Sequence, residues 1–302
     1  MAKFTPETKE ELKALIKDES IYLGDIDTSK ITDMSDLFFN STRTDFSGIE
    51  KWDTSNVENM DSMFWGCENF DQDISGWNTS SVENMDSMFA GCKSFNQPLN
   101  GWDVSSVESM KGMFWGCKTF NQDLSSWDVS KVKTMAYMFA GCENFNQDIS
   151  GWDVENTWNM RGMFKNCSTF NQNISAWDTS SVENMKGMFE GCKTFNQDIS
   201  SWDVSNIEDM SYMFSGCTFF NQDLSSWDVS SVKDMTHMFS DCRTFNQNIS
   251  NWNTSKVESM ACMFYDCTSF NQPLGDWDVS EVKYMAFMFE GCKTFNQDLS
   301  SW

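Results

Sequence analysis

The chain has 302 residues and a formal net charge of −24 at pH 7. A chain this acidic lacks the basic stripe that binds a phosphate backbone, so direct binding to nucleic acid is not expected, and basic proteins, basic peptides or divalent cations are the partners that its charge favours. No apolar run approaches the length of a membrane span of about 18 residues, so no transmembrane segment is expected either.

The first 25 residues are predicted to form an N-terminal capping helix and a lead-in. Thr5 is placed as the N-cap and Pro6 at the first helical position, a common helix start. Leu12, Leu15 and Ile16 then share one face, up to about residue 17. No apolar stretch follows the charged residues as it would in a secretory signal, so this segment on its own predicts a cytoplasmic protein.

A 25-residue repeat fills residues 52–302 in ten copies, marked by tryptophans that recur from Trp52 to Trp302. After each tryptophan come Asp or Asn, a Val or Ile, two Met three residues apart, Phe, Cys and a Phe-Asn-Gln or Phe-Asp-Gln triplet. Residues 26–51 form a degenerate first repeat, with Ile26 in the tryptophan position. A fixed period in this range predicts one solenoid, in which each coil contacts chiefly its neighbours.

Two short elements are predicted within each repeat. Val107, Met110, Met113, Phe114 and Cys117 have a spacing typical of a helix or 3₁₀ turn. A column of glycines follows, where a left-handed residue would end that helix: Gly91, Gly116, Gly141, Gly191, Gly216 and Gly291.

A short parallel strand is predicted around Leu124–Trp127 and its equivalents. Stacked parallel strands lie about 4.8 Å apart, whereas helices need up to about 10 Å. The coils would therefore curve with their strands on the inner face and their helices or 3₁₀ turns on the outer face. The expected fold class is an α/β repeat solenoid with an N-terminal capping helix.

The cysteines and acidic residues are interpreted as structural. Zinc requires close cysteine pairs or histidines, but the cysteines from Cys67 onward are 25 residues apart and the one histidine is His237. They are expected to be buried thiols, with Cys262, outside their column, the exception. The Asp after each tryptophan becomes Asn at Asn78 and Asn253, which suits backbone capping better than calcium binding. No metal, cofactor or catalytic residue is expected, since no phosphate-binding glycine motif or nucleophile elbow occurs.

The repeat motif VxxMxxMFxGCxxFNQDISxWDVS resembles the 25-residue variant of the BspA-like leucine-rich repeats of bacterial surface proteins and mycoplasma lipoproteins. The resemblance covers about residues 26–302. It implies a leucine-rich-repeat-like solenoid, a cell-surface or extracellular location, and a role in adhesion or protein binding. It carries no catalytic residues onto this chain.

Recognition is expected from the positions that change between repeats. Aromatic side chains occupy some of them and are candidate partner-binding residues: Trp65, Trp115, Tyr137, Tyr212, His237, Tyr265 and Phe287, with Trp158 as a further aromatic outlier. Packing between neighbouring coils remains the alternative for these side chains. The leading hypothesis is a non-enzymatic scaffold that binds a protein partner.

The last repeat suggests a second class of function, a self-associating rod. If the final coil has no cap, its apolar edge is exposed and favours weak dimers. The side chains of that edge are Phe289, Phe295, Leu299 and Trp302. A third hypothesis is an acidic mimic of nucleic acid, whose partner would be a DNA-binding protein.

Overall fold

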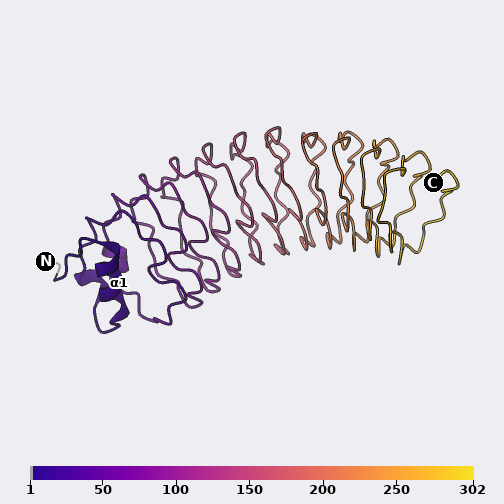
Figure 1. Ribbon diagram of the computed structural model, residues 1–302. Helices are drawn as coiled ribbons and strands as arrows, with labels where there is room; N and C mark the ends of the chain where they lie inside the picture. The colour runs from indigo at the N-terminus through magenta and orange to yellow at the C-terminus, as the bar shows by residue number, and fades with distance from the viewer. Residues whose placement is uncertain (1–2) are drawn as a thin grey trace. The chain divides into compact units, whose positions relative to one another are not determined.

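The computed structural model describes residues 3–302 and divides the chain into two compact units, Met1–Gln147 and Asp148–Trp302. Each unit contains a stack of irregular coils, one coil per 25-residue repeat (Figure 1). The helices within the described residues all belong to unit 1: the α-helix α1 (Lys9–Lys17) and the 3₁₀ helices η1 (Leu23–Asp25) and η2 (Ile49–Lys51).

Helix α1 begins later than predicted. Its N-cap is Thr8, whose side-chain oxygen accepts a hydrogen bond from the Glu11 N–H at 3.2 Å, so the assignment of Thr5 as the cap is wrong. Residues before it are held in an extended conformation, because Phe4 forms a parallel bridge with Ile26 and its N–H donates to the Asp25 carbonyl at 3.1 Å.

Adjacent coils are joined by backbone hydrogen bonds at alternate residues. In unit 1 the N–H groups of Met110, Gly112, Phe114 and Gly116 donate to the carbonyls of residues 134, 136, 138 and 140 in the following coil, at 2.7–3.1 Å. The N–H groups of the intervening residues instead close four-residue β-turns by donating to the carbonyl three residues earlier, as from Met113 to Met110 at 3.2 Å. Unit 2 repeats this pattern, for example from Tyr212 to the carbonyl of residue 236 at 2.9 Å.

This alternation replaces the helix that the apolar spacing predicted. A helix would direct every N–H to its own coil, but here half of them reach the next coil, and the segment forms consecutive turns. The turn of residues 114–117 has positive φ at its third residue, a position that favours glycine. The glycine column supplies it: Gly116 has φ 75° and Gly141 has φ 75°, so the prediction of a left-handed residue there is confirmed. Where glycine is missing, Asn166, Asp241 and Asp266 adopt the same conformation with φ 54–60°.

The predicted strand also differs from the observed pairing. Parallel pairing among the described residues is reduced to isolated bridges, and these lie at another position of the repeat, as in Ser109 with Thr134 and Asp234 with Ser259. Residues 124–127 instead form a turn, since the Trp127 N–H donates to the Leu124 carbonyl at 3.1 Å. The apolar side chains at that position therefore serve the core rather than a sheet.

The core of each unit is built from columns of stacked aromatic side chains. In unit 1 the rings of Phe114 and Phe139 stack with centroids 5.6 Å apart, and those of Trp77 and Trp102 lie 6.4 Å apart and nearly parallel. The Trp102 indole N–H also donates to the carbonyl of Ile74 at 3.2 Å, so a buried polar group is satisfied while two coils are linked. Unit 2 has the same columns: the rings of Trp177 and Trp202, at the equivalent positions, stack with centroids 6.3 Å apart.

Columns of cysteine and aspartate side chains form hydrogen bonds with other backbone groups of the coils. The thiol of Cys117 donates to the Phe89 carbonyl at 3.0 Å, and the cysteines of this column are unbonded to one another and buried, apart from the half-buried Cys292, largely as predicted. The Asp103 carboxylate accepts hydrogen bonds from the N–H and hydroxyl of Ser105, at 3.0 and 2.7 Å. The hydroxyl, followed by the N–H, lowers the pKa of Asp103 below its ordinary value.

The first repeat is attached to α1 by a buried arginine. Arg43 lies in the irregular part of residues 26–51, and only 5% of its surface is exposed. Its guanidinium donates to the carbonyls of Ile16, Ile21 and Asp45 at 3.2, 2.9 and 2.6 Å. Because Ile16 lies in the last turn of α1, the arginine joins the C-terminal end of the helix to the first coil.

Candidate binding surfaces

Two columns of the repeat hold aromatic side chains in some coils and small or charged residues in others. We call them the first and second variable columns. The first contains Ser62, Ser87, Gly112 and Tyr137 in unit 1, and Gly162, Gly187, Tyr212, His237, Cys262 and Phe287 in unit 2. The second contains Trp65, Ala90, Trp115 and Ala140 in unit 1, and Lys165, Glu190, Ser215, Ser240, Tyr265 and Glu290 in unit 2.

The backbone of the first variable column is left-handed at every position. Gly112 has φ 61°, but so do bulky residues: Tyr212 has φ 62°, His237 φ 55° and Phe287 φ 58°. A side chain in this region costs about 1–2 kcal/mol relative to glycine, because its Cβ approaches the backbone. Glycine is the residue that fits this backbone conformation best, so the aromatic residues in this column destabilise the turn locally.

Unit 1 presents a row of aromatic side chains at its surface, here called the aromatic row, in which Phe39 and Trp115 are exposed and Trp65 and Tyr137 are half-buried. Successive ring centroids are 5.7, 6.0 and 6.5 Å apart. Phe39 is 47% exposed and Trp115 50% exposed, whereas the phenylalanines one position before each tryptophan are fully buried. The rings contact one another, as the packing alternative predicted, and still leave a broad apolar surface open to solvent.

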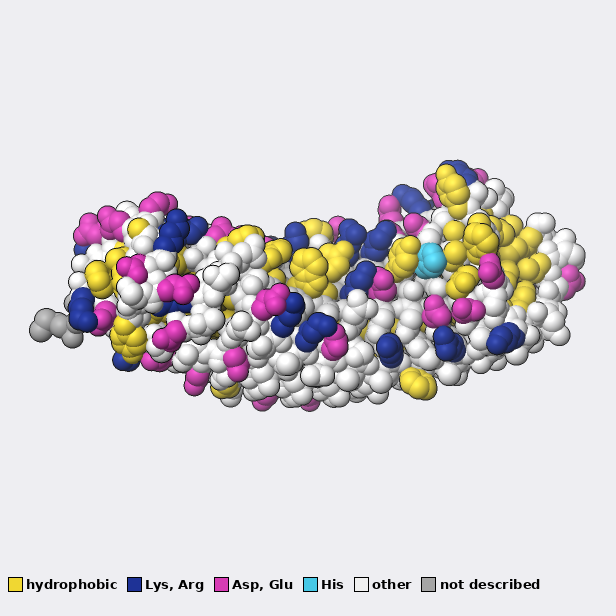
Figure 2. All heavy atoms as spheres, turned by 90° about the horizontal axis from the view of Figure 1, so that it is seen from below, with side chains coloured by type: hydrophobic (Ala, Val, Ile, Leu, Met, Phe, Trp, Pro, Cys, Tyr) yellow, Lys and Arg dark blue, Asp and Glu magenta, His cyan; other side chains and the backbone are white. Residues whose placement is uncertain are grey.

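Unit 2 contains a shallow groove of about 560 Å³ along its variable columns, here called the aromatic–acidic groove. Its lining residues are Glu190, Tyr212, Ser215, His237, Ser240, Asp241, Cys262, Tyr265, Phe287 and Glu290. The rings of Tyr212 and His237 stack with centroids 4.8 Å apart, and Phe287 is 64% exposed. Figure 2 shows hydrophobic side chains gathered around the cyan histidine, with acidic side chains beside them.

The groove is electrostatically negative. The pKa of the Tyr265 phenol is raised by the nearby negative charges of Asp266 first, then Glu290 and Asp241. Lys165 neutralises Glu190 through an ion pair of 2.8 Å, and Asp241 lies 3.7 Å from the exposed Arg243. Glu290 makes no ion pair within the described residues.

Cys262 is the half-exposed thiol of the groove, as predicted for a cysteine outside the buried column. Burial, followed by the charge of Glu290, raises its pKa above the ordinary value. A raised pKa keeps the sulfur protonated at neutral pH, which makes it a poor nucleophile. No group of three potential metal-ligating side chains occurs within residues 3–302.

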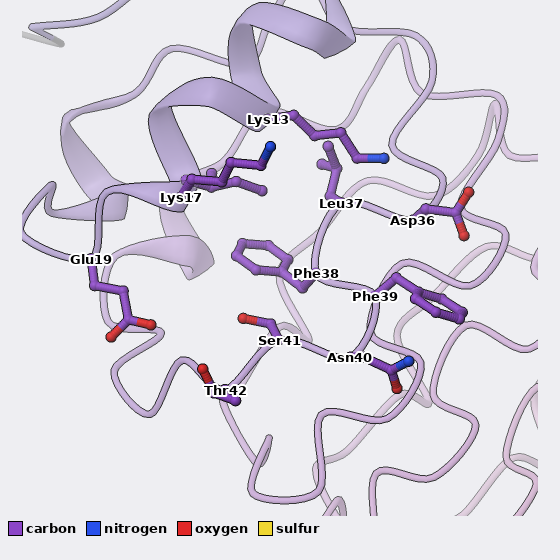
Figure 3. Close-up of a pocket in the computed structure, with 11 residues that line it drawn as sticks. Lys13, Lys17, Glu19, Asp36, Leu37, Phe38, Phe39, Asn40, Ser41 and Thr42 are labelled. Carbon is purple, nitrogen blue, oxygen red and sulfur yellow. The ribbon is translucent and has the colours of Figure 1, made fainter.

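A second hollow, of about 660 Å³, lies where α1 meets the first coil. Figure 3 shows Lys13 and Lys17 extending from α1 over Leu37 and Phe38. Lys9, on the same helix, forms an ion pair with Asp33 at 3.1 Å and donates a hydrogen bond to Ser35. Positive and negative groups mix in this hollow, so its chemistry favours no one class of ligand.

The remaining predicted residues lie outside both surfaces. Trp158 is 45% exposed, but it occupies the column of Glu108 and Lys133, which elsewhere forms ion pairs between coils. The four side chains of the predicted self-association edge are half-exposed, whereas those one repeat earlier are buried: Phe264, Phe270, Leu274 and Trp277. Glu290 was not predicted, because the variable columns were searched for aromatic residues alone, and Asp241 was not predicted because it lies in the glycine column.

The same side chains are buried in coil after coil, while surface positions differ, so the chain is a tandem-repeat protein. Four overlapping stretches, residues 10–122, 99–201, 135–245 and 184–302, match the family described as Mycoplasma protein of unknown function, DUF285. The chain belongs to this family. No curated protein matches it. The helices among the described residues are all too short or too polar to cross a membrane.

Proposed function

We propose that the chain is a non-enzymatic, leucine-rich-repeat-like solenoid that binds a protein partner through its variable columns. The observation that carries this proposal is the exposure of large aromatic rings at positions that vary, on coils whose other large apolar side chains are almost all buried. Exposed tryptophan and tyrosine side chains are the usual centres of protein-binding surfaces, because they bury much area at a small entropic cost.

Two further features support this reading. The aromatic row of unit 1 is pre-organised, since Trp65 and Trp115 contact each other edge-to-face at 6.0 Å and lose little freedom on binding. The resemblance to BspA-like repeats of bacterial surface proteins favours adhesion as the setting in which such binding occurs. Under this proposal the constant columns hold the coils and the variable columns select the partner.

The test is partner capture followed by measured affinity. The intact chain is immobilised, retained proteins are identified, and the dissociation constant of each is measured with purified components. The double variant Trp65→Ala/Trp115→Ala should weaken binding by roughly 30-fold or more, the sum of two moderate hot spots. Trp158→Ala is the matched control, because it removes an exposed tryptophan outside the variable columns. Equal losses in both variants would refute the assignment.

A further inference from the structure

We propose that the aromatic–acidic groove of unit 2 binds a basic peptide segment of the protein partner, with lysine or arginine side chains lying across its aromatic rings and their charges meeting Asp241 and Glu290. This inference rests on the proposed function and specifies the chemistry of the partner.

The first step is the shape and lining of the groove. Tyr212, His237 and Phe287 come from three coils of the first variable column, and Tyr265 lies in the second. The stacked pair of Tyr212 and His237 offers an aromatic surface to the hydrocarbon stem and charged head of a long basic side chain. Such cations are attracted to the faces of aromatic rings, most strongly when water is partly excluded.

The second step is charge. Glu190 already has a partner in Lys165 at 2.8 Å, whereas Glu290 makes no ion pair among the described residues and Asp241 makes a long one, of 3.7 Å, with the largely exposed Arg243. An apolar peptide would cover these carboxylates without neutralising them, which is unfavourable. An acidic peptide would be repelled. A basic peptide can place its cationic side chains against the aromatic rings and also neutralise the carboxylates.

The third step is the conformation that the lining side chains adopt. Gly162 and Gly187 occupy the first variable column of the same unit with φ 58° and 60°, so the coil folds with glycine at this position. Tyr212, His237 and Phe287 hold the same left-handed conformation with large side chains. Backbone strain of this kind persists where the side chain has a use. Within unit 2, all the residues of the first variable column that are not glycine line the groove.

The experiment uses the full chain and a short, acetylated and amidated peptide of alternating glycine and arginine with a fluorescent label. Its control peptide has citrulline in place of arginine, which keeps the shape and removes the charge. Fluorescence anisotropy should show saturable binding of the arginine peptide and binding at least about tenfold weaker for the citrulline peptide. Bound peptide should also slow the modification of Cys262 by a thiol reagent, located by mass spectrometry, because this thiol lies in the groove.

Two groove variants and two controls separate this site from the general acidity of the chain. Tyr212→Gly/Phe287→Gly removes two rings and gives the column the residue that other coils already have. Asp241→Asn/Glu290→Gln removes two charges with little change of shape. Each should weaken binding at least about tenfold, with an unchanged or raised midpoint of thermal unfolding for the glycine variant. The controls are Phe219→Ser, an exposed ring outside the groove, and Glu208→Gln, an exposed acid that pairs with Lys233.

The outcomes are distinct. Weaker binding in the groove variants alone, with protection of Cys262, supports the inference. No saturable binding, equal loss in Glu208→Gln, or equal affinity for the citrulline peptide would overturn it. If the captured partner loses affinity for the Trp65→Ala/Trp115→Ala protein but binds the groove variants normally, the proposed function stands and this inference fails. If the arginine peptide binds the groove but no partner depends on Trp65 and Trp115, the aromatic row is the part that fails.

Discussion

Replacement of Arg43 by alanine tests how the capping helix is attached to the repeats. The guanidinium makes three hydrogen bonds to carbonyl oxygens, of 3.2, 2.9 and 2.6 Å, and it is 95% buried. A hydrogen bond from a charged donor contributes about 1.5–3 kcal/mol, and its loss leaves a carbonyl without a partner. Water that enters the vacated space will recover part of this. We therefore expect Arg43→Ala to cost about 3–5 kcal/mol at the α1 end of unit 1.

The assay is hydrogen exchange of the α1 amides, read by mass spectrometry, together with urea unfolding. A loss of about 3 kcal/mol corresponds to an exchange rate of α1 raised by more than about 100-fold. Arg243→Ala is the matched control, because that arginine is exposed and only 3.7 Å from Asp241, so its loss should change stability by less than about 0.5 kcal/mol. Unchanged protection of α1 in Arg43→Ala would show that the helix is held by its apolar face alone.

Two further predictions follow from the pKa shifts. Thiol reagents at neutral pH should modify Cys262 first, since burial raises the pKa of Cys67 to about 11 and that of the fully buried Cys117 further still; equal rates at Cys262 and Cys117 in mass-spectrometric mapping would contradict this. The folded-state pKa of Asp103 is lowered from 3.8, so its stabilising contribution is present above about pH 4 and is lost as the pH falls through the folded value. Urea midpoints should fall on acidification below pH 4, less so in Asp103→Asn, and a flat midpoint would count against this role.

Local structure could be predicted from the sequence where a residue type is strongly favoured by one backbone conformation. The column of glycines predicted left-handed backbone, and Gly116 has it; the structure adds that Asn166 adopts the same conformation where glycine is missing. The predicted helix or 3₁₀ turn is replaced by successive β-turns, because these place Met110, Met113 and Phe114 on one side just as a helix does. Periodicity records which side chains are buried, not whether an N–H bonds within its coil or to the next one.

Arg43 was not predicted for a different reason. It lies in the irregular first repeat, where no second copy of the motif exists for comparison, and its partners are backbone carbonyls that leave no mark on the sequence. The same holds for the acidic residues Asp241 and Glu290, which lie together with the predicted aromatic residues only once the coils bring their columns side by side.

The direction of the hydrogen bonds between coils gives each stack an electrical polarity. In unit 1 four N–H groups of each coil point to the following coil and fewer point back, as from Lys133 to the Glu108 carbonyl, so a net peptide dipole adds along the stack. At the first coil no earlier coil donates to the equivalent carbonyls of Ser35 and Leu37, and partial negative charge collects at that face. In this acidic chain the face is covered by a helix with three lysines spaced four residues apart, Lys9, Lys13 and Lys17. The cap thus supplies positive charge as well as apolar surface where the dipoles of the stack end.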